Sequence, residues 1–146
     1  MSDVVKFRFD VDGSDFSSAG AASVTVKKKL RQLGYSPDVI RRVSIAMYEG
    51  EINMVIHANG GIAEVEASDD KIVIVLADKG PGIPDVELAM QAGYSTAKDH
   101  IRNLGFGAGM GLPNMIKYTD DLRIDTVVGE GTTITMTVLI CQKIIK

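Results

Sequence analysis

The chain has 146 residues, of which 45% are hydrophobic and 24% are charged, a balance typical of a globular domain with a substantial core. Its net charge of −3, its 5% aromatic content and its lack of tryptophan argue against nucleic-acid binding. No apolar stretch approaches the roughly 20 residues that span a bilayer, and the polar start lacks the apolar part of a signal peptide. We therefore expect one domain over residues 1–146, located in the cytoplasm, with no nucleic-acid or membrane contacts.

The first part of the chain predicts a strand followed by two helices. Charged and bulky residues alternate over residues 6–10, which favours a strand. Apolar residues then recur at helical spacing from about residue 16 to residue 33, and Gly34 ends this helix. Ser36-Pro37 supplies a capping hydroxyl and a first-turn proline for a second, long helix, which Asn59-Gly60-Gly61 ends.

The rest of the chain predicts four strands, a short helix and a long irregular segment. The runs that favour strands are residues 63–67, 71–78, 122–128 and 132–141. The helix begins at Pro113 and continues to about Tyr118. Residues 80–111 hold seven of the fifteen glycines, and so long a weakly periodic insertion indicates a mobile functional segment. Helices followed by hairpin-connected strands favour an α+β two-layer sandwich over a doubly wound parallel sheet.

A carboxylate and an amide lie one turn apart on the second predicted helix. Glu49 and Asn53 project from one face, whereas Glu51 points largely away from that face. The carboxylate could accept a proton from a hydroxyl or water, and the amide oxygen could complete the shell of a phosphate-bound magnesium ion. An ordinary pair on the helix surface is the alternative interpretation.

Asp78 follows an almost wholly apolar strand and precedes Gly80 and Gly82. It is either a turn-forming aspartate or an acceptor at the edge of a pocket, where it would suit an adenine amino group. The two glycines would let the backbone pass close to a flat base, and the glycine run ending at Gly111 would offer amides to phosphate. The common motifs GxxxxGK[ST] and GxGxxG after a strand are absent, so the residues predict an ATP site of another kind.

The order of these elements resembles the GHKL ATP-binding superfamily, which includes histidine-kinase catalytic domains, gyrase-type ATPases and bacterial anti-sigma-factor kinases. The matching residues are Glu49 and Asn53 for its N box, Asp78, Gly80 and Gly82 for its DxGxG element, Gly107, Gly109 and Gly111 for its second glycine box, and Gly131-Thr132 for its last motif. The resemblance implies a Bergerat-type sandwich with a mixed, mostly antiparallel sheet and a mobile ATP lid over residues 83–108.

The resemblance also implies roles for the matched residues. Glu49 would be the general base, Asn53 a magnesium ligand, Asp78 the adenine contact and Thr132 an assisting adenine contact. The remaining nucleotide contacts would be Gly80, Gly82, Gly105, Gly107, Gly109, Gly111 and Leu112. The implied cofactors are ATP and Mg²⁺.

Within the superfamily, the small size and the segment from Gly93 to Asn114 look most like the serine/threonine kinases of bacterial partner-switching modules. The expected function is therefore MgATP-dependent phosphorylation of a STAS-domain partner, an anti-anti-sigma or scaffold protein. An anti-sigma factor that mainly sequesters a sigma factor and a stand-alone ATPase are the alternatives.

The chain departs from the anti-sigma kinases just before the glycine box. Those kinases often carry an arginine there that reaches the terminal phosphate, whereas this chain has Phe106-Gly107-Ala108. Lys98 or Arg102 could neutralise phosphate instead. The departure favours the switch-kinase branch, for which a downstream phosphatase is a further expected partner, and the sequence leaves a homodimer open.

Overall fold

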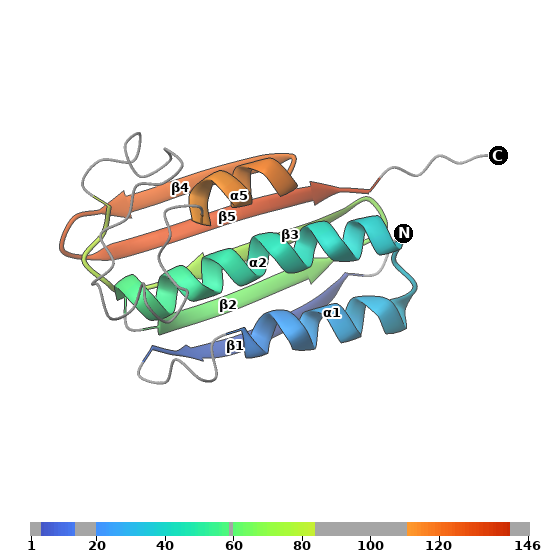
Figure 1. Cartoon of the computed structure of the whole chain (residues 1–146), viewed down its shortest axis with the longest axis horizontal. Helices are drawn as coiled ribbons and strands as arrows, with labels where there is room; N and C mark the ends of the chain where they lie inside the picture. The colour runs from blue at the N-terminus through green and yellow to red at the C-terminus, as the bar shows by residue number, and fades with distance from the viewer. Residues whose placement is uncertain (1–3, 14–19, 59, 84–110, 141–146) are drawn as a thin grey trace.

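The computed structural model describes residues 4–13, 20–58, 60–83 and 111–140. These residues form two layers, an antiparallel sheet with helices on one face (Figure 1). The strands are β1 (Val5–Asp12), β2 (Gly60–Ala67), β3 (Lys71–Ala77), β4 (Asp121–Val127) and β5 (Gly131–Leu139). The helices are α1 (Ala21–Leu33), α2 (Pro37–Ala58) and α5 (Gly111–Tyr118). The expected α+β two-layer sandwich is confirmed.

The described strands lie in the order β1-β2-β3-β5-β4, and all four pairings among them are antiparallel. The mixed sheet that we expected therefore contains no parallel pair in this part of the chain. Ala77 at the end of β3 pairs with Thr133 near the start of β5, and Val127 at the end of β4 pairs with Gly131. The end of α2 lies at this same end of the sheet, on the left in Figure 1, and α1 starts nearer the middle and runs to the right.

The core lies between the helices and one face of the sheet. Alternate residues of β3 point inward and are buried, as are the apolar residues of α2 that face them. Gly50 in the middle of α2 makes the closest approach, because a Cβ there would collide with the Leu76 side chain and lie 3.4 Å from Sδ of Met115. This close packing places the part of α2 around Gly50 over the end of β3. None of the described helices is both long and apolar enough to cross a membrane.

Local signals set two helix boundaries as predicted. Ser36 Oγ accepts a hydrogen bond of 3.2 Å from the Val39 N–H, and α2 begins at Pro37. Gly34 adopts a φ of 89°, and its N–H donates to the Arg31 carbonyl, so α1 ends there.

Two predicted helix starts were wrong. Gly20 has a φ of 95°, and this left-handed residue makes α1 begin at Ala21 rather than near residue 16. The last helix begins at Gly111, which makes Pro113 its third residue instead of its first. A proline is accepted there because the first four N–H groups of a helix lack partners within it.

Candidate functional site

Glu49 and Asn53 lie on the side of α2 that faces α5. Asn114 Nδ2 donates a hydrogen bond of 2.8 Å to Glu49 Oε2. One turn further along α2, the Asn53 amide lies against Gly111, where a Cβ would be only 2.8 Å from Asn53 Nδ2. We call Glu49, Asn53, Gly111 and Asn114 the α5-side cluster. Sequence reasoning predicted the first three and missed Asn114, which is near them only because α5 packs along α2.

The α5-side cluster has the groups that a magnesium-bound phosphate needs. The first backbone N–H groups of the eight-residue helix α5 have no partners within the helix and favour an anion. Asn53 offers an amide oxygen, a type of ligand that Mg²⁺ accepts. Glu49 is half-buried and, among the described residues, accepts one side-chain hydrogen bond, so it keeps acceptor capacity for a hydroxyl.

Asp78 follows β3 and is held by the backbone on both sides of it. Its N–H donates to the Thr132 carbonyl at 2.9 Å, while its Oδ1 accepts from the N–H groups of Thr132 at 3.1 Å and Gly80 at 2.9 Å. Asp78 thus forms the turn that we considered as one interpretation. Both hydrogen bonds that its carboxylate accepts from described residues go to Oδ1, so Oδ2 remains for a donor such as an exocyclic amine.

Two threonines extend this network to the neighbouring strand. Thr126 on β4 is the cross-strand partner of Thr132 on β5, and their hydroxyl oxygens are 2.9 Å apart. The Ile83 N–H donates to Thr126 Oγ1 at 2.9 Å, so the same hydroxyl also fixes the chain after Gly82. Sequence reasoning missed Thr126, although its place opposite Thr132 in the predicted hairpin was a usable signal.

The remaining predicted contacts divide into three groups. Gly80 and Gly82 lie at the Asp78 end of the sheet, and a Cβ at Gly82 would be 2.7 Å from the Val127 carbonyl oxygen. The Leu112 side chain is buried in the core, where it anchors the first turn of α5. The predicted lid beyond Ile83 lies outside the described residues, as do Gly105, Gly107, Gly109, Lys98 and Arg102.

Met54 and Asp78 connect the two halves of the site. A Cβ at Gly61 would be 2.7 Å from Met54 Cε and 3.0 Å from Asp78 Cα, so both residues lie close to this glycine. Because Met54 follows Asn53 on α2, the α5-side cluster and the Asp78 network lie at the same end of the molecule. The fold therefore assembles residues that are far apart in the sequence into one polar region.

Glu51 points away from this region, as predicted, but it has a structural role that sequence reasoning missed. Only 2% of the residue is exposed, and its carboxylate accepts hydrogen bonds of 2.6–3.1 Å from the Gly20, Ala22 and Ser23 N–H groups and from the Ser23 hydroxyl. Gly20 has no side chain to cap α1, and no acidic residue lies in the first turn of that helix. Glu51 caps α1 from the neighbouring helix instead.

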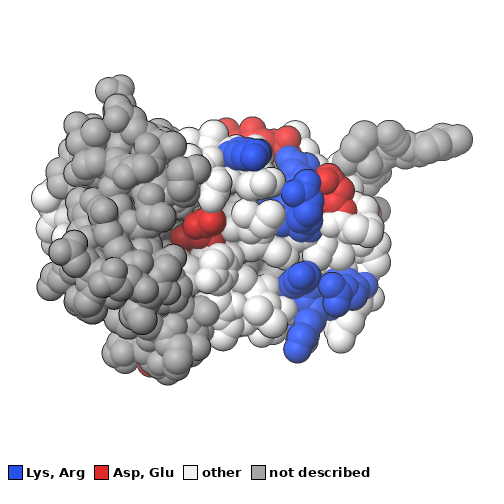
Figure 2. All heavy atoms as spheres, in the orientation of Figure 1, with Lys and Arg blue, Asp and Glu red and all other residues white. Residues whose placement is uncertain are grey.

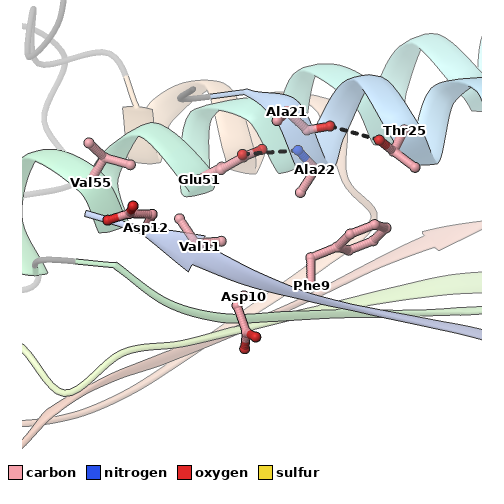
Figure 3. Close-up of a pocket in the computed structure, with 9 residues that line it drawn as sticks. All are labelled: Phe9, Asp10, Val11, Asp12, Ala21, Ala22, Thr25, Glu51 and Val55. Carbon is pink, nitrogen blue, oxygen red and sulfur yellow. Dashed lines mark hydrogen bonds between the residues drawn. The ribbon is translucent and has the colours of Figure 1, made fainter. Parts of the chain in front are cut away.

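A hollow of about 250 Å³ lies beside Glu51 (Figure 3). It lies between β1, α1 and α2, and it is lined by Phe9, Asp10, Val11, Asp12, Ala21, Ala22, Thr25, Glu51 and Val55. In Figure 3 the Glu51 carboxylate points toward the start of α1. Because Glu51 is two residues from both Glu49 and Asn53, this hollow lies on the other side of α2 from the α5-side cluster.

Comparison with known proteins identifies the family. Residues 14–138 match the model of the histidine kinase-like ATPase domain. The chain belongs to this family. The match confirms the superfamily expected from the motifs and, with it, a domain that uses ATP.

The similar proteins include regulators of one type. The chain is 32% identical over 108 residues to the serine/threonine-protein kinase RsbT of Bacillus subtilis, covering 71% of this chain and 75% of the relative. It is 36% identical over 111 residues to an anti-sigma F factor of Caldanaerobacter subterraneus, covering 73% and 74%. It is 34% identical over 122 residues to the anti-sigma F factor of Bacillus licheniformis, covering 80% of each chain. These matches support classification as a kinase of the anti-sigma regulatory type.

A solved structure supports the fold independently. The mycobacterial sensor histidine kinase MprB matches with a TM-score of 0.51 and 17% identity, over 92% of this chain and 97% of that chain. At this identity the likeness concerns the arrangement of helices and strands alone.

Proposed function

We propose that this protein is a MgATP-dependent serine/threonine kinase of the anti-sigma regulatory type that phosphorylates a STAS-domain partner. The observation that carries the proposal is the presence, at one end of the sheet, of an adenine-type acceptor at Asp78 and a phosphate-type cluster beside α5. The printed names of the relatives, a serine/threonine-protein kinase and anti-sigma F factors, support the same function.

Different residues bind the adenine end and the phosphate end of the nucleotide. Asp78 Oδ2 accepts the adenine amino group, and the Thr132 hydroxyl, oriented by Thr126, assists it. The N–H groups at the start of α5 receive phosphate oxygens, and Asn53 binds the accompanying magnesium ion, which neutralises phosphate charge. The two ends of one nucleotide are thereby fixed by α2, α5, β3 and β5.

Glu49 acts on the protein substrate. Its Oε1 accepts the proton of a serine or threonine hydroxyl of the partner while that oxygen bonds to the γ-phosphorus and the bond to the β-phosphate oxygen breaks. Asn114 holds Glu49 Oε2 at 2.8 Å and leaves the other carboxylate oxygen to point toward the hydroxyl. The products are the phosphorylated partner, ADP and the proton on Glu49.

The direct test is transfer of label from γ-labelled ATP, with magnesium, to the STAS proteins of the source organism. Label should appear on a serine or threonine with the wild-type protein and be lost with Glu49→Gln, while ATP binding persists. Glu64→Gln is the matched control, because this exposed carboxylate on β2 lies on the face of the sheet opposite the helices and pairs only loosely with Arg8. Equal labelling by wild type and Glu49→Gln would remove Glu49 from the mechanism.

The magnesium role of Asn53 has its own measurement. Asn53→Ala should weaken ATP binding in the presence of magnesium and leave binding in excess chelator nearly unchanged. Equal affinity of wild type and variant with magnesium present would show that Asn53 is not a ligand.

A sequestering function is the second candidate, because several relatives are named anti-sigma F factors. In that case the protein would retain a sigma subunit in a pull-down, and no STAS protein would be labelled despite ATP binding. Release of inorganic phosphate without any protein partner would instead indicate a stand-alone ATPase.

A further inference from the structure

Positive charge gathers at one end of the helix layer, on the right in Figure 2. On α1 the buried residues Ala22, Val26 and Leu30 face the core. Lys28 and Arg31 lie on the opposite side of the helix, and Lys27 lies at the edge nearer α2. All three cations are exposed.

The neighbouring helices continue this positive surface. The Arg41 guanidinium on α2 lies 5.5 Å from the centre of the Tyr118 ring, and Lys117 Nζ on α5 lies 5.3 Å from the same ring. The Arg41 side chain is 58% exposed, and its 3.5 Å contact with exposed Asp38 is a weak surface pair. We call the five residues Lys27, Lys28, Arg31, Arg41 and Lys117 the basic rim.

The outer face of the sheet is charged differently. There three of the cations form ion pairs across or along strands, Lys6–Glu66, Arg8–Glu64 and Arg123–Asp125. In the basic rim, by contrast, only Arg41 forms an ion pair with a described residue. Four of the five cations of the basic rim therefore form no ion pair with a described residue, in a protein whose net charge is −3.

Each of the three helices also has an exposed apolar side chain beside these cations. They are Val24 on α1, Tyr48 on α2 and Ile116 on α5, which are 53%, 41% and 43% exposed. Tyr48 packs over Gly20 at the start of α1, where a Cβ would be 2.7 Å from its ring. An apolar centre with a charged edge, including tyrosine and arginine, is the usual composition of a protein-binding surface.

The basic rim is close enough to Glu49 for one docked partner to cover both. Arg41 and Glu49 are eight residues apart on α2, which corresponds to roughly 12 Å along a helix. A standard protein interface buries about 800 Å² on each partner, a patch roughly 30 Å across. A protein that presents a hydroxyl to Glu49 and lies over the helices would therefore also cover Arg41.

We propose that the helix face formed by Val24, Tyr48, Ile116 and the basic rim docks the phosphoacceptor protein through an acidic surface of that protein. The inference rests on the proposed kinase function and names the partner surface that it uses. An acidic protein is the partner that complements this helix face, because the face combines cations that have no ion-pair partner among the described residues with exposed apolar side chains. The basic rim speeds encounter and sets the register that brings the hydroxyl to Glu49.

The test is the double variant Lys28→Glu/Arg31→Glu, assayed with the STAS protein that accepts label. The KM for that protein should rise about tenfold or more at low salt, while the KM for ATP and the kcat at saturating partner stay within about twofold. The matched control Lys71→Glu/Arg123→Glu makes the same charge change on exposed strand residues of β3 and β4 and should leave all three constants unchanged. Added salt should raise the wild-type KM more than that of the Lys28/Arg31 variant.

A second pair, Lys27→Glu/Lys117→Glu, places the change on two different helices and should give the same result if the first pair unfolds the protein. An unchanged KM for the labelled partner in both pairs would overturn the docking inference and leave the kinase function standing. Loss of binding to phosphatidylserine vesicles without a change in that KM would assign the cations to a lipid surface and also overturn it. Failure to label any STAS protein would remove the kinase function and this docking partner together.

Discussion

The two sides of α2 carry carboxylates in opposite situations. On the α5 side, Glu49 is half-buried and accepts one hydrogen bond, from the Asn114 amide. On the α1 side, Glu51 is almost fully buried and accepts four, from the first turn of α1 and the Ser23 hydroxyl. The two residues are separated by one glycine in the sequence, yet their surroundings assign them different roles.

The difference lies in hydrogen-bond capacity, which separates the acid that we propose to be reactive from the structural one. A carboxylate has about four acceptor sites, and Glu51 has all of them filled by groups that belong to the fold. Glu49 accepts one hydrogen bond from a described residue, so it keeps acceptor sites for the proposed substrate hydroxyl, and it belongs to the cluster that would bind phosphate. We therefore expect that substitution of Glu49 lowers activity without lowering stability, and that substitution of Glu51 lowers stability.

The largest expected effect is the loss of phosphoryl transfer in Glu49→Gln. Removal of a general base lowers the rate by about 100-fold to 10,000-fold, and because Glu49 makes few contacts with the fold, the unfolding midpoint should stay the same. Rates of label transfer and thermal unfolding curves measure the two quantities. A rate within tenfold of wild type would erase the proposed distinction between the two carboxylates.

Glu51→Ala should give the converse result. It leaves three N–H groups of the start of α1 without their acceptor, so the free energy of unfolding should fall by about 2–4 kcal/mol. Urea titration measures this loss, with Glu64→Ala as the control for removal of an exposed carboxylate. Ser23→Ala, which removes one of the four hydrogen bonds, should cost about 1 kcal/mol. Full stability of Glu51→Ala would mean that α1 does not depend on this cap.

Gly111→Ala should affect only the α5 side. The added Cβ would lie 2.8 Å from Asn53 Nδ2 and would turn the amide away from its present position. ATP affinity with magnesium should fall about tenfold, whereas affinity in excess chelator should change little. An equal fall under both conditions would mean that the methyl group blocks the nucleotide itself.

The smallest effect concerns Asp120, which ties the N-terminal half of α2 to the end of α5. The Leu139 N–H, at 2.7 Å, and then Arg42, at 2.9 Å, hold the pKa of this carboxyl below its usual value. Since the folded pKa is lower than the unfolded pKa of about 3.9, the contact stabilises the fold above that pH and is lost as pH falls further. Asp120→Asn should cost under about 1 kcal/mol at pH 7. The difference from wild type in urea titrations should shrink as pH falls below the unfolded pKa and disappear once pH is below the folded pKa, and a constant difference at every pH would contradict the assignment.

The sequence by itself determined the element types, several of their ends and the order of the site residues. Ser36-Pro37 starts α2 and Gly34 ends α1 because capping and left-handed backbone are properties of these residues and their nearest neighbours. The i and i+4 spacing of Glu49 and Asn53 put them on one helix face for the same local reason. Their roles as base and magnesium ligand stay predictions.

Only the tertiary structure decided which groups meet across elements. The partners of Glu51 lie 28 to 31 residues away, and Asn114 lies 65 residues from Glu49, so neither contact leaves a periodic pattern in the chain. The start of α1 likewise depends on Gly20 and on a cap supplied by another helix. Helix spacing and capping follow from neighbouring residues, whereas these contacts depend on how α1, α2 and α5 pack over the sheet.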